Sequence, residues 1–284
     1  MNTKRNIRIG MGQLLVEGGE PERNLARAEE LAREASASKC DILLLPECMD
    51  LAWTHPSAKV EAQPIPGPYS DLLAQFAKDY NLYICAGLTE KSPSGKVYNT
   101  AVFIDNKGNL LHTYRKINIL KVEKEFYQAG QSLSTLETPF GVVGVNICAD
   151  NYVDGLSIGH TLARMGAELI LSPSSWTVDY SVTEDNDPYG QKWIRPYRHL
   201  ASLYNMAIVG TTSVGVIVGG PYEGKKSVGC SLAVDKSGVI ASGSFNEFSS
   251  QLILADLTVP VRDERGTEIS DRLRAEGYDF EAGL

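Results

Sequence analysis

Two pairs of segments resemble each other at nearly the same separation along the chain. Residues 41–46 (DILLLP) resemble residues 168–173 (ELILSP), which lie 127 positions further on. Residues 99–108 (NTAVFIDNKG) resemble residues 229–238 (GCSLAVDKSG), which lie 130 positions further on. Two separate repeats at almost equal displacement predict an internal duplication, with two similar halves related by a pseudo-twofold axis.

Local patterns predict that each half contains both strands and helices. Alternating or short apolar runs predict strands over 6–15, 41–46, 82–88, 97–105, 110–116, 141–147, 168–172, 207–214, 231–234 and 251–256. Helical spacing predicts helices over 22–36, 69–80, 156–165 and 192–205, the last interrupted by Pro196. The simplest α/β architecture for such a duplication is a four-layer α-β-β-α sandwich of two packed mixed sheets.

The chain is expected to form a single domain over residues 1–284. Its core should cover about residues 6–256, and a charged C-terminal arm of about residues 257–284 should be exposed or contact a partner. No stretch rich in Pro, Gly or Ser divides the sequence into two domains.

Composition restricts the possible partners and cofactors. The net charge of −8 argues against nucleic acid or an anionic membrane as the main partner. A run of about 18 apolar residues, which a membrane-spanning helix needs, is absent, and residues 1–15 lack the continuous apolar core expected of a signal peptide. We therefore expect a cytoplasmic protein. The five cysteines show neither CxxC spacing nor a disulfide pattern, so we expect no metal site and no cofactor.

The stretch GVVGVNICADNY, residues 141–152, contains the strongest candidate nucleophile. An uncharged strand runs into Cys148, and the residues that follow favour the start of a helix. A thiol at a helix N-terminus is ionised more easily, because backbone N–H groups and the helix dipole favour the thiolate. Taken alone, a cysteine at this position is more often a core residue.

Three charged residues lie where buried strands end or close by. Glu47 directly follows the buried run DILLLP, and a carboxylate there is costly unless it is paired or used. Lys116 ends the predicted strand 110–116, and Glu123 follows it by seven positions. Glu125 is a rival to Glu123, and local spacing does not separate the two.

Three ordered motifs resemble the signature of the nitrilase superfamily of carbon–nitrogen hydrolases. They are LLLPE at 43–47, YRKINI at 114–119 with EKEFYQAG at 123–130, and NICAD at 146–150. The resemblance implies an α-β-β-α sandwich that forms a homodimer or a higher homo-oligomer. It places the catalytic Glu, Lys and Cys of the family on Glu47, Lys116 and Cys148. Its second glutamate falls on Glu123, with Glu125 as the alternative.

The resemblance also implies a reaction. Glu47 would take the thiol proton, while Lys116 and the backbone N–H of Ala149 would stabilise the oxyanion. Cys148 would form a thioester with a small amide or N-carbamoyl compound, releasing ammonia or an amine. Ala149-Asp150 replaces the Trp-Glu of true nitrilases, which favours an amidase-like member. Nitrile hydrolysis by the same site, or a degenerate binding or scaffold protein, remain alternatives.

The segment 150–152 departs most from the family pattern, because Tyr152 stands where many members have arginine. We therefore expect this protein's own specificity to arise there. Candidate pocket walls are five aromatic residues: Tyr152, Trp176, Trp53, Phe126 and Tyr127. A Cys-His hydrolase is a weaker alternative, because His55, His112 and His199 are compatible by spacing but no motif supports them.

Overall fold

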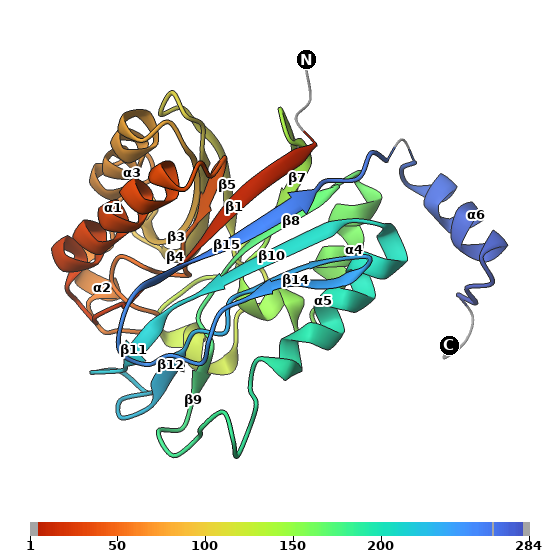
Figure 1. Cartoon of the computed structure of the whole chain (residues 1–284). Coiled ribbons are helices and arrows are strands. Elements are labelled where there is room, and N and C mark those ends of the chain that lie inside the picture. The colour runs from red at the N-terminus through yellow and green to blue at the C-terminus, as the bar shows by residue number, and fades with distance from the viewer. Residues whose placement is uncertain (1–4, 263, 281–284) are drawn as a thin grey trace.

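A computed structural model describes residues 5–262 and 264–280, and it contains two six-stranded mixed sheets (Figure 1). The first sheet has the order β15 (Gln251–Thr258), β1 (Asn6–Gln13), β2 (Ile42–Leu44), β3 (Tyr83–Lys91), β4 (Val97–Ile104), β5 (Leu110–Arg115). The second has the order β14 (Gly238–Ser242), β13 (Leu232–Asp235), β10 (Ala207–Thr212), β8 (Leu169–Ser174), β7 (Gly141–Val145), β6 (Thr135–Thr138).

The remaining elements complete the two layers of helices and a small third sheet. The helices are α1 (Pro21–Ala37), α2 (Ala58–Glu61), α3 (Pro68–Asp79), α4 (Ser157–Arg164), α5 (Gln191–Tyr204) and α6 (Thr267–Ala275). Two short 3₁₀ helices are η1 (Lys121–Glu125) and η2 (Cys148–Asn151). The third sheet has the order β11 (Val214–Val216), β12 (Lys226–Val228), β9 (Thr177–Val178).

The predicted pseudo-twofold relation is confirmed by strand order and direction. In the first sheet β1, β2 and β3 are parallel, while β4, β5 and the edge strand β15 pair antiparallel. The second sheet repeats this pattern, with β7, β8 and β10 parallel and β13, β14 and β6 antiparallel. The similar segments 41–46 and 168–173 therefore form equivalent strands, β2 and β8.

The four-layer arrangement follows from which side chains each strand buries. Alternation along β2 sends Ile42 and Leu44 into the core between the two sheets. Leu43 and Leu45 instead pack in a second core with residues of α1 and α3. Figure 1 shows α1 and α3 covering one outer face and α4 and α5 covering the other. The predicted α-β-β-α sandwich is confirmed.

Several element boundaries differ from the sequence prediction. The helix predicted over 192–205 runs without a break through Pro196 as α5, which begins at Gln191. The strand predicted over 141–147 ends at Val145, two residues earlier than expected. The short strands β6, β9, β11, β12 and β14 carry no run long enough to show a period, and they were not predicted.

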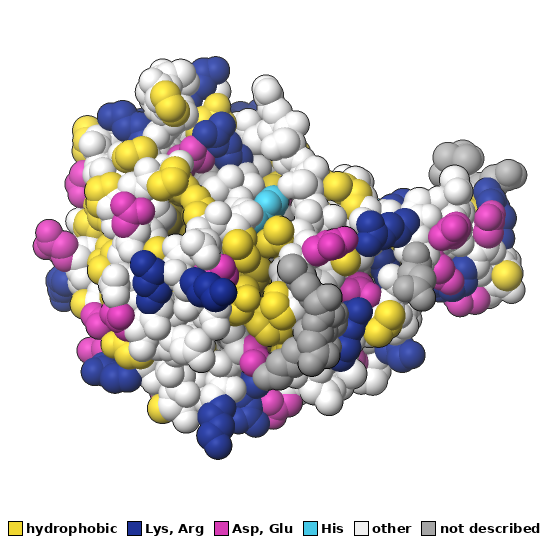
Figure 2. Space-filling view, turned by 90° about the horizontal axis from the view of Figure 1, so that it is seen from above, with side chains coloured by type: hydrophobic (Ala, Val, Ile, Leu, Met, Phe, Trp, Pro, Cys, Tyr) yellow, Lys and Arg dark blue, Asp and Glu magenta, His cyan; other side chains and the backbone are white. Residues whose placement is uncertain are grey.

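Within the described residues, the helices include none that is long and apolar enough to cross a membrane. On the face drawn in Figure 2, basic and acidic side chains are interspersed, so Lys and Arg form no continuous basic surface there. The α6 region, at the right of Figures 1 and 2, carries both signs of charge as well.

The C-terminal arm, predicted over about 257–284 to be exposed or to contact a partner, is largely exposed beyond residue 260, but a few of its side chains anchor it to the chain itself; residues 263 and 281–284 lie outside the described residues. Arg262 donates to Ala163 O at 2.5 Å and to Tyr204 O at 2.6 Å, two carbonyls at the C-terminal ends of α4 and α5. Ile269 and Leu273 of α6 are buried. One guanidinium thus satisfies carbonyl groups of two helices, at the end where the helix dipole favours a cation.

We expect Arg262→Ala to lower the free energy of unfolding by about 2 kcal/mol, because charge-assisted hydrogen bonds to two helix ends are lost. Urea unfolding followed by circular dichroism measures the change. Arg33→Ala, which removes an exposed guanidinium from α1, is the control and should stay within about 0.5 kcal/mol of the wild type. Equal effects of the two substitutions would show that the arm contributes no stability through Arg262.

Candidate active site

A buried lysine lies between two buried carboxylates at one end of the first sheet. Lys116, directly after β5, donates from Nζ to Glu47 Oε1 at 2.7 Å. The same Nζ donates to Glu123 Oε1 at 2.9 Å and to Glu123 Oε2 at 3.0 Å. The side chains of all three residues have 0% exposure. The structure thus brings together three of the four residues predicted to react or to support the reaction.

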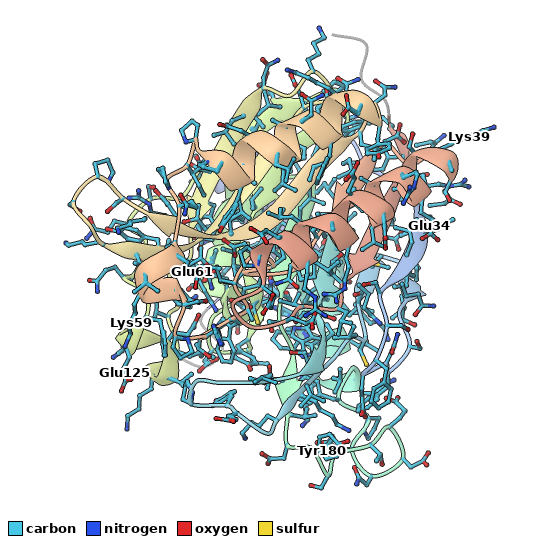
Figure 3. The ribbon with its side chains drawn as sticks, turned by 90° about the vertical axis from the view of Figure 1, so that its left-hand side faces the viewer. Glu34, Lys39, Lys59, Glu61, Glu125 and Tyr180 are labelled. Carbon is cyan, nitrogen blue, oxygen red and sulfur yellow. The ribbon has the colours of Figure 1, made fainter. Side chains whose placement is uncertain are left out.

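The geometry separates the two glutamates that local spacing left open. Glu123 also accepts hydrogen bonds from Trp53 Nε1 at 2.8 Å and from the backbone N–H of Leu120 at 2.7 Å. The 3₁₀ turn η1 points it inward. Glu125, on the same turn, is exposed, and Figure 3 shows it at the periphery near Lys59 and Glu61. Glu123 is therefore the glutamate of the cluster.

Burial and mutual charge set the protonation of the cluster. Burial alone would lower the pKa of Lys116, but the carboxylates of Glu47 and Glu123 raise that pKa well above its usual value. Lys116 therefore stays charged. Burial raises the pKa of Glu47, against the opposing effect of Lys116, so this carboxyl gains a proton more readily than an exposed glutamate.

Cys148 lies in a strained turn just beyond β7. It begins the short 3₁₀ helix η2 with φ of 40°, a left-handed conformation that is uncommon for a residue other than glycine. Its Sγ lies 3.9 Å from Ser175 O. Burial, and then the charge of Glu47, raise the pKa of the thiol well above its usual value.

This geometry corrects the expectation that a helix N-terminus ionises Cys148. The helix α4 begins only at Ser157, and a one-turn 3₁₀ helix provides little of the dipole that an α-helix would. The resting thiol is therefore neutral. It requires a nearby base to react. Cys148 and Glu47 both lie against the end of β8, because Cys148 Sγ is 3.9 Å from Ser175 O and the backbone N–H of Glu47 donates to Ser174 O at 3.2 Å.

Asp150 connects the cysteine turn to β5 and to the residues that follow Lys116. It accepts from the backbone N–H of Ile147 at 2.9 Å, from Tyr114 Oη at 2.7 Å and from the backbone N–H of Asn118 at 3.1 Å. Asp150 is fully buried. The segment after Cys148, which we expected to set specificity, therefore begins with a residue that holds the site together.

Asn99 is a member of the cluster that the sequence reasoning missed. It lies on β4, and its Nδ2 donates to Glu47 Oε1 at 2.7 Å and to Glu123 Oε1 at 3.3 Å. Its backbone carbonyl accepts from the N–H of Lys116 at 2.9 Å. The signal available in the sequence was an asparagine, a residue that strands disfavour, in the mostly apolar strand VYNTAVFI.

A small cavity opens at Glu47. It has a volume of about 20 Å³ and is also lined by Trp53, His55, Ser175 and Ser213. A single water molecule needs roughly 10–15 Å³ and two or more polar partners, so this cavity can hold one. Glu47 Oε2 is buried and has no hydrogen-bond partner among the described residues, whereas Oε1 is engaged.

The five aromatic residues predicted as pocket walls fall into two groups. Trp53, which lines the cavity, packs with Phe126 and Tyr127 on the Glu123 side. On the Cys148 side, Trp193 lies between two of the others: its ring centroid is 4.5 Å from that of Trp176 and 4.8 Å from that of Tyr152. Trp193 was not predicted, although it is an aromatic residue on the buried face of α5.

Neither a Cys–His dyad at Cys148 nor a metal cluster is present in the described part of the chain. His160 Nδ1 lies 2.7 Å from Tyr204 Oη, and His55 Nδ1 lies 2.8 Å from Ser57 Oγ. Among the described residues no histidine is hydrogen-bonded to Cys148. No group of three or more His, Cys, Asp or Glu side chains within residues 5–262 and 264–280 could hold a metal ion.

Comparison with known proteins gives consistent results. A sequence profile described as carbon–nitrogen hydrolase matches residues 8–264. An omega-amidase of Danio rerio is 32% identical over 164 residues, which are 55% of this chain and 58% of the relative. A nitrilase of Pyrococcus abyssi is 34% identical over 167 residues, which are 57% of this chain and 62% of the relative. The matches thus span about three fifths of the length of these curated relatives.

Solved structures share the fold over almost the whole chain. A carbon–nitrogen hydrolase of Helicobacter pylori has a TM-score of 0.78 at 20% identity, covering 96% of this chain and 94% of the other. A double mutant of the amidase from Nesterenkonia sp. AN1, in complex with acrylamide, has a TM-score of 0.77 at 19% identity, covering 96% of each chain. At this identity the likeness shows the fold alone.

We expect Glu123→Gln to lower the free energy of unfolding by about 3 kcal/mol, because it removes one partner of a buried ammonium. Glu125→Gln is the matched control, and it should change stability by less than about 0.5 kcal/mol because that side chain is exposed. Urea unfolding of both variants provides the comparison. A larger effect at Glu125 would contradict the position assigned to Glu123.

Proposed function

The chain belongs to the carbon–nitrogen hydrolase family, in the nitrilase superfamily, and we propose that it hydrolyses a non-peptide carbon–nitrogen bond in a small amide or N-carbamoyl compound. The observation that carries the proposal is the buried Lys116 ammonium, held by Glu47 and Glu123 and within electrostatic reach of the Cys148 thiol. This arrangement provides a nucleophile, a base and a fixed positive charge in a water-poor site.

The first step is attack by sulfur. Because the Cys148 thiol is neutral at rest, its proton must leave as the carbon–sulfur bond forms. Glu47 Oε2, which is free of other hydrogen bonds among the described residues, takes this proton. The electron pair of the amide C=O bond moves to oxygen and produces a tetrahedral oxyanion.

The oxyanion is stabilised by charge that is already in place. Lys116 remains positively charged because two carboxylates flank it, so no reorganisation is needed when negative charge develops on the substrate oxygen. The backbone N–H of Ala149, the residue after the nucleophile, is proposed as the second donor. Loss of one such donor typically costs about 2.7–4 kcal/mol of barrier.

Collapse of the intermediate breaks the carbon–nitrogen bond. Glu47 returns its proton to the leaving nitrogen, which departs as ammonia or an amine, and the acyl group remains on Cys148 as a thioester. Glu47 then takes a proton from a water molecule that attacks the thioester. The second tetrahedral intermediate releases the acid and returns the proton to sulfur, which restores the thiol.

The proposal of an amide substrate is supported by the omega-amidase relatives. The nitrilase of Pyrococcus abyssi supports a nitrile as the alternative substrate for the same thiol. In the described structure Tyr152 stacks on Trp193, so position 152 offers no cationic clamp for a carboxylate-bearing substrate.

We expect ammonia release from at least one member of a panel of short amides, carbamoyl compounds and nitriles. Cys148→Ala should reduce this turnover by at least 10³-fold, because the alanine variant forms no thioester. Coupled ammonia detection measures the rate, and mass spectrometry of the quenched wild-type enzyme should show one acyl group on the peptide that contains Cys148.

Cys40→Ala is the matched control, because Cys40 is a buried thiol in the outer core with residues of α1 and α3, whereas Cys148 lies in the core between the sheets. It should retain turnover at the wild-type level per folded molecule. Turnover that survives Cys148→Ala would exclude the thiol mechanism. A nitrile turned over in preference to every amide would instead assign the alternative reaction.

We also propose that the protein is a cytoplasmic homodimer or higher homo-oligomer. The support is an exposed apolar side chain, Val153 at 65% exposure, directly beyond the cysteine turn, together with the family resemblance. Light scattering at micromolar concentration should give at least twice the mass of one chain, and a monomer would contradict the proposal. Val153→Asp should weaken the assembly, while Val60→Asp, at 75% exposure on α2, should not.

A further inference from the structure

Among the described residues, Asn99 is the one uncharged residue whose side chain bridges the two carboxylates on either side of Lys116. Its Nδ2 lies 2.7 Å from Glu47 Oε1 and 3.3 Å from Glu123 Oε1. Its orientation is fixed by charge, because turning the amide over would place its oxygen against both carboxylates. Asn99 Oδ1 is buried and has no hydrogen-bond partner among the described residues, so no contact of this oxygen favours the flipped amide.

The two oxygens of Glu47 differ as a result. Oε1 receives hydrogen bonds from Lys116 Nζ and from Asn99 Nδ2, both at 2.7 Å. Oε2 receives none from the described residues. A carboxylate oxygen that already accepts two strong hydrogen bonds is a weaker base than its unoccupied partner, so proton transfer is directed to Oε2.

Asn99 also fixes the backbone of the lysine. Its carbonyl accepts from the N–H of Lys116, so a single residue of β4 contacts all three charged members of the cluster. The strand itself is rigid, since Asn99 pairs with Thr89 of β3 and both residues are buried. These contacts would keep Glu47 from rotating when its ion pair is disturbed during the reaction.

We propose that Asn99 is a positioning residue of the active site: it holds Glu47 through Oε1, keeps that carboxyl ionised, and leaves Oε2 as the oxygen that accepts the thiol proton. The proposal deepens the function proposed above, because it rests on Glu47 acting as the base. Asn99 itself contacts neither the thiol nor the substrate in this scheme.

The pH dependence should reveal this role. The ionisable groups around Glu47 are Lys116, Glu123, Cys148 and Cys48. Burial raises the pKa of Glu47 above 4.5, while Lys116 and then Asn99 oppose that rise. Activity needs the ionised carboxylate, so the wild-type rate should fall as pH drops through a midpoint above 4.5. Removal of the Asn99 donor should move that midpoint to higher pH.

The test compares Asn99→Ala with the wild type by the pH profile of kcat/KM. We expect the acidic midpoint to move up by about one pH unit and kcat to fall about 10- to 100-fold, with KM within about threefold. Asn99→Ser keeps a smaller hydroxyl donor and should show a smaller shift in the same direction. If the alanine variant does not fold, the shift of the acidic midpoint in Asn99→Ser tests the proposal instead.

Asn24→Ala is the matched control. Asn24 is also a fully buried asparagine, and its Nδ2 donates to Glu17 O at 2.8 Å and to Asp50 O at 2.9 Å, outside the charged cluster. Its loss should lower stability without moving the acidic midpoint. An unchanged midpoint in both Asn99→Ala and Asn99→Ser would overturn the proposal.

A second readout does not require turnover. Alkylation of Cys148 by iodoacetamide, followed on its peptide by mass spectrometry, also depends on removal of the thiol proton. Its acidic limb should shift in Asn99→Ala as the kcat/KM profile does. If no compound of the substrate panel is turned over but the acidic midpoint of the alkylation rate still shifts, the proposed reaction is wrong while the role of Asn99 is supported. If the panel is active and neither limb shifts, the role of Asn99 fails alone.

Discussion

The ammonium of Lys116 is buried between two carboxylates, and this arrangement governs the rest of the site. Taking three charges out of water costs several kcal/mol for each ion, and close ion pairs repay that cost only when the remaining hydrogen-bonding capacity is also met. One positive and two negative charges leave an excess of one negative charge. The neutral donors Asn99, Trp53 and the Leu120 N–H stabilise that excess. Among the described residues Glu47 Oε2 receives no hydrogen bond, which supports its proposed role as the base.

The internal duplication explains why these groups meet. The carboxyl ends of parallel strands are where open α/β sheets place ligands, and β2 and β8 are equivalent strands of the two halves. Glu47 follows β2, and its backbone N–H donates to the carbonyl of Ser174, 127 positions further on, at 3.2 Å. The site therefore lies at the pseudo-twofold axis. One half provides Glu47 and Lys116, and the other provides the thiol of Cys148.

Sequence patterns identified candidate site residues where a polar residue's place along a buried strand could be read. Glu47, Lys116 and Cys148 each come at or just after a strand end, and the family resemblance assigned them to one site. The structure joins Lys116 to Glu47 by a hydrogen bond and places Cys148 against the end of β8, where Glu47 also lies. The side chain of Glu123 points inward because it lies on a short 3₁₀ turn. Such a turn has no apolar period that could be recognised in the sequence, so only the family resemblance favoured Glu123 over Glu125. The role of Asn99 depends on which side chains lie across the sheet. The expected helix dipole at Cys148 was wrong because a single turn separates the strand from the rest of the loop.

The segment after the cysteine contains residues with two different roles, although the sequence alone suggested one role, substrate specificity, for the whole segment. The Asp150 carboxylate binds Tyr114 Oη and the Asn118 N–H, which lie two residues before and two after Lys116. It thereby fixes the thiol turn against the ammonium, so a change at Asp150 would disturb the chemistry itself. Tyr152 makes no such contact and stacks instead on Trp193. We therefore propose that position 152, rather than the whole segment, is where substrate choice can be adjusted, because a change in its size would leave the hydrogen bonds of the charged cluster in place.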